Sequence, residues 1–313
     1  MNNILMQLSY APATLVVCIL LIPITTLWFG LTRFTTGAGW LLATLVVGLY
    51  AVWAYFFIYW YVLSVYLRWT PVVFFLVAAA VSFFRRVPGD TNAQITTAGW
   101  IGAGVLVILV VILGILDGLV IHGQFPNTKT VELEFPLRDG KYVVAHGGSS
   151  FLINYHVAVD AYVRYAMDIM QLDGLGRRAN GILPPQLSDY VIYGQEVHSP
   201  CAGKVIVILD GVPESPVFGG NPDHPGGNHV AIACDAEPVA VWLVHLEKGS
   251  IPVIVGQAVQ AGDLLGKVGS SGNSSEPHLH LVAQEYKGGS FGPGVAITFN
   301  GRFLARNSVY SQP

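Results

Sequence analysis

Two histidines near the C-terminus, His278 and His280, are separated by one leucine within an apolar run. If this run is a β-strand, both imidazoles point to the same face, because side chains of a strand alternate between its two faces. Two imidazoles on one face can bind a metal ion and still leave a nitrogen available for proton transfer. This pair is therefore the first candidate for chemistry in the chain.

The composition divides the chain into two parts. Of the 313 residues, 53% are hydrophobic and only 11% are charged, and most of the charges follow residue 123. The net charge is −3 and no basic patch is visible, so we expect no nucleic-acid partner. Up to residue 123 the charged side chains are Arg33, Arg68, Arg85, Arg86, Asp90 and Asp117.

The first part contains long apolar runs. A helix that crosses a bilayer needs about 20 apolar residues, and three of the runs have this length. The third is shorter and could form a re-entrant segment instead. The near absence of charge disfavours a buried soluble core, so residues 1–123 are expected to form a transmembrane helical domain of about four spans in a lipid bilayer. The runs are Pro12–Leu31, Trp40–Val62, Pro71–Phe84 and Gly99–Leu116.

The arginines predict the orientation of these spans. Arg33 lies in the first loop, and Arg85 and Arg86 lie in the third. The excess of basic residues in cytoplasmic loops places both of these loops inside and both termini outside the cytoplasm. Arg68 is the one exception, because it lies in the short second loop, which this orientation places outside the cytoplasm. No basic residue precedes the first run, so a cleaved signal peptide is not expected.

After Gly123 the hydrophobic periodicity changes. Val131–Phe135 alternates strictly, and Val205–Leu209, His229–Ala233 and Val239–Val244 are short runs rich in β-branched residues, bounded by Gly, Pro or Asp. These patterns predict a mainly antiparallel β domain over residues 124–313. Its glycine turns are typical of barrel-sandwich folds, although the exposed lysine motif of a biotinyl or lipoyl carrier is not found.

The segment Val253–Leu281, which ends in Gly-Asn-Ser-Ser-Glu-Pro-His-Leu-His-Leu, resembles the core of the lysostaphin/LytM-type zinc metalloendopeptidases, as does Val244-His245-Leu246. The resemblance covers roughly residues 140–285 and not the membrane part. It implies a LytM-type β domain, a Zn²⁺ cofactor and peptidoglycan peptides as substrate. By the same resemblance, Asp168 and His280 are metal ligands, whereas His278 and His245 act in catalysis.

Zinc chemistry fits these residue types. A catalytic zinc ion takes three protein ligands, keeps a position for water and lowers the pKa of that water to about 7. A histidine that is not a ligand can then accept the water proton or stabilise the developing oxyanion.

One position departs from the family pattern. The family has a His-x-x-x-Asp motif, and Arg164 stands where its histidine is expected. Arginine stays protonated and cannot bind zinc. Either the site has lost its metal or another residue supplies the third ligand. The best candidate is His156, twelve residues before Asp168, and His146 is less attractive because it lies ten residues further upstream.

The cysteines carry little information. Cys18 lies inside the first apolar run, and Cys201 and Cys234 lie in the β domain without zinc-site spacing. On the expected topology both lie outside the cytoplasm, where disulfides persist, so they could pair. Neither spacing nor context demands a bridge, and separate buried thiols are the favoured interpretation.

Three functions compete. The preferred hypothesis is a membrane-anchored zinc metalloendopeptidase of the bacterial cytoplasmic (inner) membrane, with its C-terminal domain on the extracytoplasmic side, that cleaves peptide bonds of peptidoglycan. The alternative is a non-catalytic LytM-like protein that binds or regulates a cell-wall hydrolase. This alternative is suggested by Arg164, which replaces an expected metal ligand. A transporter with an appended domain is disfavoured, because the spans hold almost no internal polar residues for a pathway.

Overall fold

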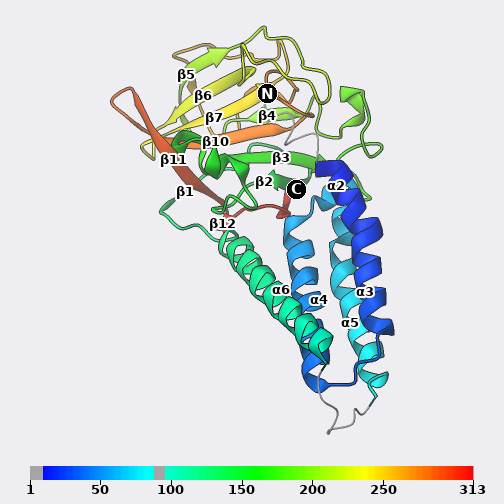
Figure 1. Cartoon of the computed structure of the whole chain (residues 1–313). Coiled ribbons are helices and arrows are strands. Elements are labelled where there is room, and N and C mark those ends of the chain that lie inside the picture. Colours follow the sequence, from blue (N-terminus) through cyan, green and yellow to red (C-terminus); the bar gives the residue numbers. More distant parts are fainter. Residues whose placement is uncertain (1–9, 88–95, 313) are drawn as a thin grey trace. The chain divides into compact units, whose positions relative to one another are not determined.

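The computed structural model describes residues 10–87 and 96–312 (Figure 1). The chain forms two compact units, each described here by itself. One unit consists of Pro12–Trp60 and Tyr66–Ile121 and is helical. The other contains His122–Pro313 and is built on β-sheet, and it also includes the short segment Tyr61–Val65 from between the helices.

The expectation of about four long apolar helices is confirmed. Within the described residues, four helices are long and apolar enough to cross a membrane: Ala13–Leu31, Gly37–Phe57, Val65–Phe84 and Thr97–His122. The third has 20 residues because helical turns precede its apolar run, and this length permits a full span. The individual elements are α2 (Tyr10–Val16), η1 (Val17–Leu21), α3 (Ile22–Leu31), α4 (Gly37–Phe57), η2 (Trp60–Val62), η3 (Val65–Trp69), α5 (Thr70–Phe84) and α6 (Thr97–His122).

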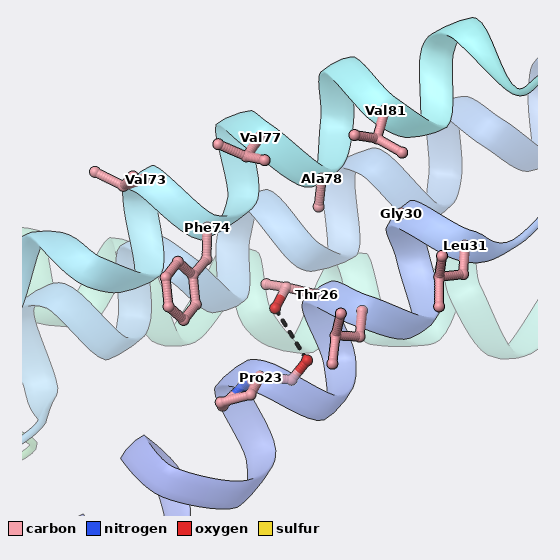
Figure 2. A pocket seen from close by; sticks show the side chains of 10 residues that line it. Pro23, Thr26, Gly30, Leu31, Val73, Phe74, Val77, Ala78 and Val81 are labelled. Atoms are coloured by element: carbon pink, nitrogen blue, oxygen red, sulfur yellow. Dashed lines mark hydrogen bonds between the residues drawn. The ribbon is translucent and has the colours of Figure 1, made fainter.

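Helices α3 and α5 approach closely where small residues meet. A Cβ atom added at Gly30 would lie 3.5 Å from the backbone of Ala78, so the helices are in van der Waals contact there. Beside this contact, apolar side chains line a groove of about 560 Å³ (Figure 2). The Thr26 hydroxyl in the groove donates to the Pro23 carbonyl and to the Ile22 carbonyl of its own helix. The groove therefore offers apolar surface with its polar group already satisfied.

The β unit is dominated by one large sheet. Its strands follow the order β13-β2-β3-β10-β7-β6-β5-β8, and β11 extends it from β10. Every pairing between these strands is antiparallel except the parallel pair of β1 and β11, so the predicted mainly antiparallel fold is confirmed. The strands are β1 (Thr130–Glu132), β2 (Gly140–His146), β3 (Met167–Leu172), β4 (Glu196–His198), β5 (Gly203–Leu209), β6 (Asn228–Cys234), β7 (Val239–Leu246), β8 (Ala258–Val259), β9 (Leu264–Lys267), β10 (Leu279–Lys287), β11 (Ser290–Phe299), β12 (Arg302–Phe303) and β13 (Val309–Gln312).

The β-branched runs of the sequence form the centre of this sheet. Val205–Leu209, His229–Ala233 and Val239–Val244 lie within β5, β6 and β7, and their inward residues belong to a single hydrophobic core. Between β2 and β3 the chain makes two short 3₁₀ turns, η4 (Tyr155–Ala158) and η5 (Ala161–Val163). A longer connection with the turn η6 (Leu187–Asp189) follows β3.

The favoured expectation of separate cysteine thiols is wrong, because Cys201 and Cys234 form a disulfide with a Cα–Cα distance of 5.8 Å. The physical reason is the register of the sheet, in which Cys234 lies opposite Gly203, two residues after Cys201. The strands are close at this point: a Cβ atom at position 203 would meet the Ala233 carbonyl oxygen at 2.2 Å. Spacing along the sequence did not reveal this cross-strand contact.

Candidate metal centre

Two neighbouring strands bring the first pair of candidate ligands together. In the antiparallel pairing of β3 with β10, Asp168 lies directly opposite His280. The Nδ1 atom of His280 lies 2.9 Å from Oδ1 of Asp168. All six residues of β3 are buried, so the carboxylate is largely shielded from water.

His156 reaches the same carboxylate from the turn η4. The side-chain NH₂ of Asn154 donates to the carbonyls of Gly148 and Ala166, at 3.0 and 3.1 Å, which fixes the direction of its amide oxygen. This oxygen can only accept, so the Nδ1 atom of His156, 2.8 Å away, must carry the proton. The other ring nitrogen, Nε2, consequently presents a lone pair and lies 3.7 Å from Oδ1 of Asp168.

The Nε2 atom of His156 is buried, and within the described chain no hydrogen-bond partner satisfies it. A buried acceptor without a partner is costly, and a metal ion would satisfy it. The ligand atoms of His156, Asp168 and His280 all lie within 4.8 Å of one another. One carboxylate and two imidazoles form a donor set that suits catalytic zinc. The residues present therefore fit a zinc ion.

A second group of histidines adjoins the first. His245, His278 and His280 also have ligand atoms within 4.8 Å of one another. The Nδ1 atom of His278 lies 2.8 Å from the carbonyl oxygen of Glu276, and that of His245 lies 2.7 Å from the carbonyl oxygen of Ser271. Because carbonyls only accept, both histidines carry a proton on Nδ1 and expose the lone pair of Nε2.

The positions of these two imidazoles are set by their own segments. Nε2 of His278 lies 3.5 Å from Oδ1 of Asp168, so this atom faces the candidate metal position. His245 adopts a φ of 64° at the end of β7, a conformation that is unusual for a residue other than glycine. Strained backbone of this kind persists where the surrounding structure holds a side chain in a required place.

Burial and mutual charge set the protonation of the group. Burial lowers the pKa of His156 to about 3 and holds the pKa of His245 well below its usual value. Burial also acts to raise the pKa of Asp168, but the imidazoles of His156 and His278 outweigh it, so the net pKa lies well below the usual range. At neutral pH His156 and His245 are thus neutral and Asp168 is ionised, which are the forms that metal binding requires.

Comparison with known families covers part of this arrangement. Residues 189–293 match the model of Peptidase family M23. This part of the chain resembles an M23 peptidase. The matched M23 segment includes His245, His278 and His280, whereas His156 and Asp168 lie before it.

Three solved structures illustrate the similarity. Lysostaphin from Staphylococcus simulans is 23% identical, over 31% of this chain and 37% of that protein, with a TM-score of 0.22. A zinc-containing peptidase from Vibrio cholerae is 22% identical, over 40% of this chain and 29% of that one, with a TM-score of 0.24. A putative M23 peptidase from Pseudomonas aeruginosa is 18% identical, over 63% and 59%, with a TM-score of 0.28. The chain therefore spans less than two thirds of each of these proteins.

Two residues that the sequence placed near the M23 site have other roles. Arg164 is exposed and ends the turn η5, with its guanidinium carbon 5.9 Å from the centre of the Tyr165 ring. His146 lies opposite Asp168 in the pairing of β2 with β3, but its Nδ1 atom accepts from the Arg306 guanidinium at 3.1 Å. Among the described residues, neither ligand group includes His146.

Three features around the M23 site were not predicted from the sequence. One is the amide of Asn154, which orients His156. Another is a fully buried ion pair, in which Nε of Arg178 lies 2.9 Å from both carboxylate oxygens of Glu276. The third is Tyr61, which lines a small cavity with Asp168 and His278. Glu276 belongs to the loop that carries the family resemblance, but no local signal marks its partner or Tyr61.

Proposed function

We propose that this chain is a membrane-anchored zinc metalloendopeptidase that cleaves peptide bonds of peptidoglycan. The observation that carries the proposal is the convergence of His156, Asp168 and His280, with Nε2 of His156 buried and unsatisfied. The match of residues 189–293 to Peptidase family M23 supports a peptidase, and the similar structures include an antimicrobial peptidase and a zinc-containing peptidase.

His156, Asp168 and His280 would hold the zinc ion, which when bound supplies a water of lowered pKa and a Lewis acid for the scissile carbonyl. Nε2 of His278 faces this position, so it can take a proton from the attacking water and return it to the leaving amine. His245 borders His278, with ring centres 4.9 Å apart, and its neighbouring imidazole can stabilise charge on the substrate oxygen.

Arg164 motivates the second candidate, a non-catalytic binding protein that keeps the groove without the metal. Metal analysis separates the two candidates. The full chain, purified in detergent, should contain one zinc ion per molecule and should release peptides from peptidoglycan in a chelator-sensitive manner. A protein that binds no zinc and cleaves nothing would favour the binding protein.

Single substitutions test the assigned roles. His156→Ala and His280→Ala should each lose zinc, whereas His278→Ala should keep the metal and lose hydrolysis by about 100-fold or more, as for other general acid–base groups. His224→Ala is the matched control, because His224 is an exposed loop residue. If His156→Ala retains zinc, the third ligand is another group, and equal metal loss in His278→Ala would contradict the division of roles.

We also propose that the protein lies in the bacterial cytoplasmic (inner) membrane, with the β domain on the extracytoplasmic side. Arg33, Arg85 and Arg86 support this orientation through the charge of the first and third loops. The Val65 N–H donates to the Gly176 carbonyl within the β unit, so the second loop and the β domain must share a side; this fits two spans between them, and the arginines are the argument for which side it is. Reporter fusions at Thr36 and after Phe125 should report opposite sides, and two cytoplasmic signals would contradict the model.

A further inference from the structure

The segment Tyr61–Val65, between α4 and α5, belongs to the compact β unit. Three hydrogen bonds attach it to residues 175–178, which follow β3. The N–H of Val65 donates to the Gly176 carbonyl at 2.9 Å, and the Ser64 hydroxyl donates to the Leu175 carbonyl at 2.7 Å. The N–H of Arg178 donates to the Tyr61 carbonyl at 3.2 Å. The segment is therefore held at both of its ends.

Tyr61 occupies the space beside the candidate metal centre. Its side chain is 1% exposed and borders one cavity together with Asp168, Glu276 and His278. The cavity has a volume of about 20 Å³, which is room for a single water molecule. Sites that bind small ligands are usually about 300 Å³ or larger, so with Tyr61 in this position the cavity has no room for a peptide.

The contacts that hold Tyr61 also belong to the scaffold of His278. The Arg178 guanidinium carbon lies 5.9 Å from the centre of the Tyr61 ring, and the same guanidinium pairs with Glu276. The Glu276 carbonyl in turn orients His278. A displacement of Tyr61 would therefore change both the lining of the cavity and the contacts that orient the His278 imidazole.

We propose that the segment Tyr61–Val65 is a lid of the peptidase site, and that a peptide enters from this side only when the segment leaves residues 175–178. Both ends of the segment continue along the chain into apolar helices, towards α4 and α5, so a movement of these helices would pull on the lid. The membrane part of the chain would then regulate access to the site as well as anchor the enzyme. This inference rests on the proposed peptidase function.

Accessibility of His278 tests the lid without requiring catalysis. The full chain in detergent is stripped of metal and treated with diethyl pyrocarbonate, and mass spectrometry follows the modification of each histidine. Exposed His224 serves as the internal reference for reagent activity. We expect Tyr61→Ala to raise the modification rate of His278 by about fivefold or more, and Ser64→Gly, which removes one hydrogen bond of the segment, to raise it by a smaller factor. Tyr66→Ala is the matched control, because Tyr66 is exposed and lies outside the β unit.

The same variants are then compared in hydrolysis of a soluble stem peptide, where opening of the lid should raise kcat/KM in Tyr61→Ala and leave Tyr66→Ala unchanged. Thermal unfolding identifies any variant that does not fold, and Ser64→Gly provides a test outside the cavity if Tyr61→Ala is lost. Unchanged His278 modification in folded Tyr61→Ala and Ser64→Gly would overturn the lid, even if the wild type cleaves peptide. Increased modification without zinc binding or cleavage in any variant would instead support the lid and refute the peptidase.

Discussion

The buried ion pair between Arg178 and Glu276 permits a quantitative test of how the site is supported. The two side chains are 1% and 0% exposed, and Nε of Arg178 lies 2.9 Å from both carboxylate oxygens. A further N–H of the guanidinium donates to the Ile182 carbonyl at 2.9 Å. Arg178→Met removes the positive charge and leaves the Glu276 carboxylate buried without its partner.

The expected cost follows from this geometry. Removing one partner of a buried, hydrogen-bonded ion pair typically destabilises a protein by about 3–5 kcal/mol, because the remaining charge stays desolvated. For a unit of about 190 residues, 1 kcal/mol shifts the melting temperature by roughly 2–4 °C, so Arg178→Met should lower it by about 6–20 °C. Glu276→Met should have a similar cost, whereas the double variant Arg178→Met/Glu276→Met should cost no more than either single one.

Activity provides a second measurement. The Glu276 carbonyl accepts from Nδ1 of His278, so loosening this loop should reduce peptide hydrolysis in the double variant while zinc stays bound. The assay is thermal unfolding of the full chain in detergent by near-ultraviolet circular dichroism, together with zinc content and hydrolysis. If the two single costs add in the double variant, or if Arg178→Met unfolds at the wild-type temperature, the reasoning about the pair is refuted.

Other predictions concern the disulfide, the orientation of His156 and pH. Replacing Cys201 and Cys234, which are 33 residues apart, by serine should destabilise the β domain by about 3–4 kcal/mol from loop entropy, measured by denaturant unfolding; an unchanged midpoint would contradict it. Asn154→Ala should weaken zinc binding by about 10- to 100-fold in a chelator competition, because the Nδ1 proton of His156 loses its acceptor, and unchanged affinity would count against this role. Because the pKa of His156 is lowered from 6.5 to about 3, the unfolded metal-free chain binds the extra proton between these values. Its stability should therefore fall as the pH drops below about 6.5, by up to about 1.4 kcal/mol per pH unit, and equal stability at pH 7 and 5 would contradict the burial argument.

Much of the fold followed from local patterns. Apolar runs of bilayer length predicted three of the four long helices, the third run was shorter than the helix it forms, and runs of β-branched residues predicted β5, β6 and β7. His280 lies on a strand, β10, as the apolar run predicted. His278 lies just before the start of this strand at Leu279. These features depend on neighbours in the sequence, which is why a single sequence reveals them.

The site depends more on contacts between distant segments. The sequence showed that Arg164 replaces one expected metal ligand and that His156 is the nearest histidine that could take its place. The structure brings His156 to Asp168, and its role as a ligand stays a prediction. The sequence could not show that the amide of Asn154 would orient the imidazole, because this requires the folded path of the β2–β3 connection, which brings the carbonyls of Gly148 and Ala166 from its two ends to the same side chain. The disulfide, the ion pair of Arg178 and the position of Tyr61 were missed for the same reason.

The connection between the last apolar helix and the β domain is short. Only the seven residues 123–129 separate the end of α6 from the start of β1, and an extended chain of this length spans at most about 25 Å. The available reach is smaller still, since the Gly123 and Phe125 carbonyls both accept hydrogen bonds from Ser149 of the β unit. If the helices span a bilayer and the β domain is a peptidase, as proposed, a linker of this length restricts cleavage to peptides close to the membrane surface.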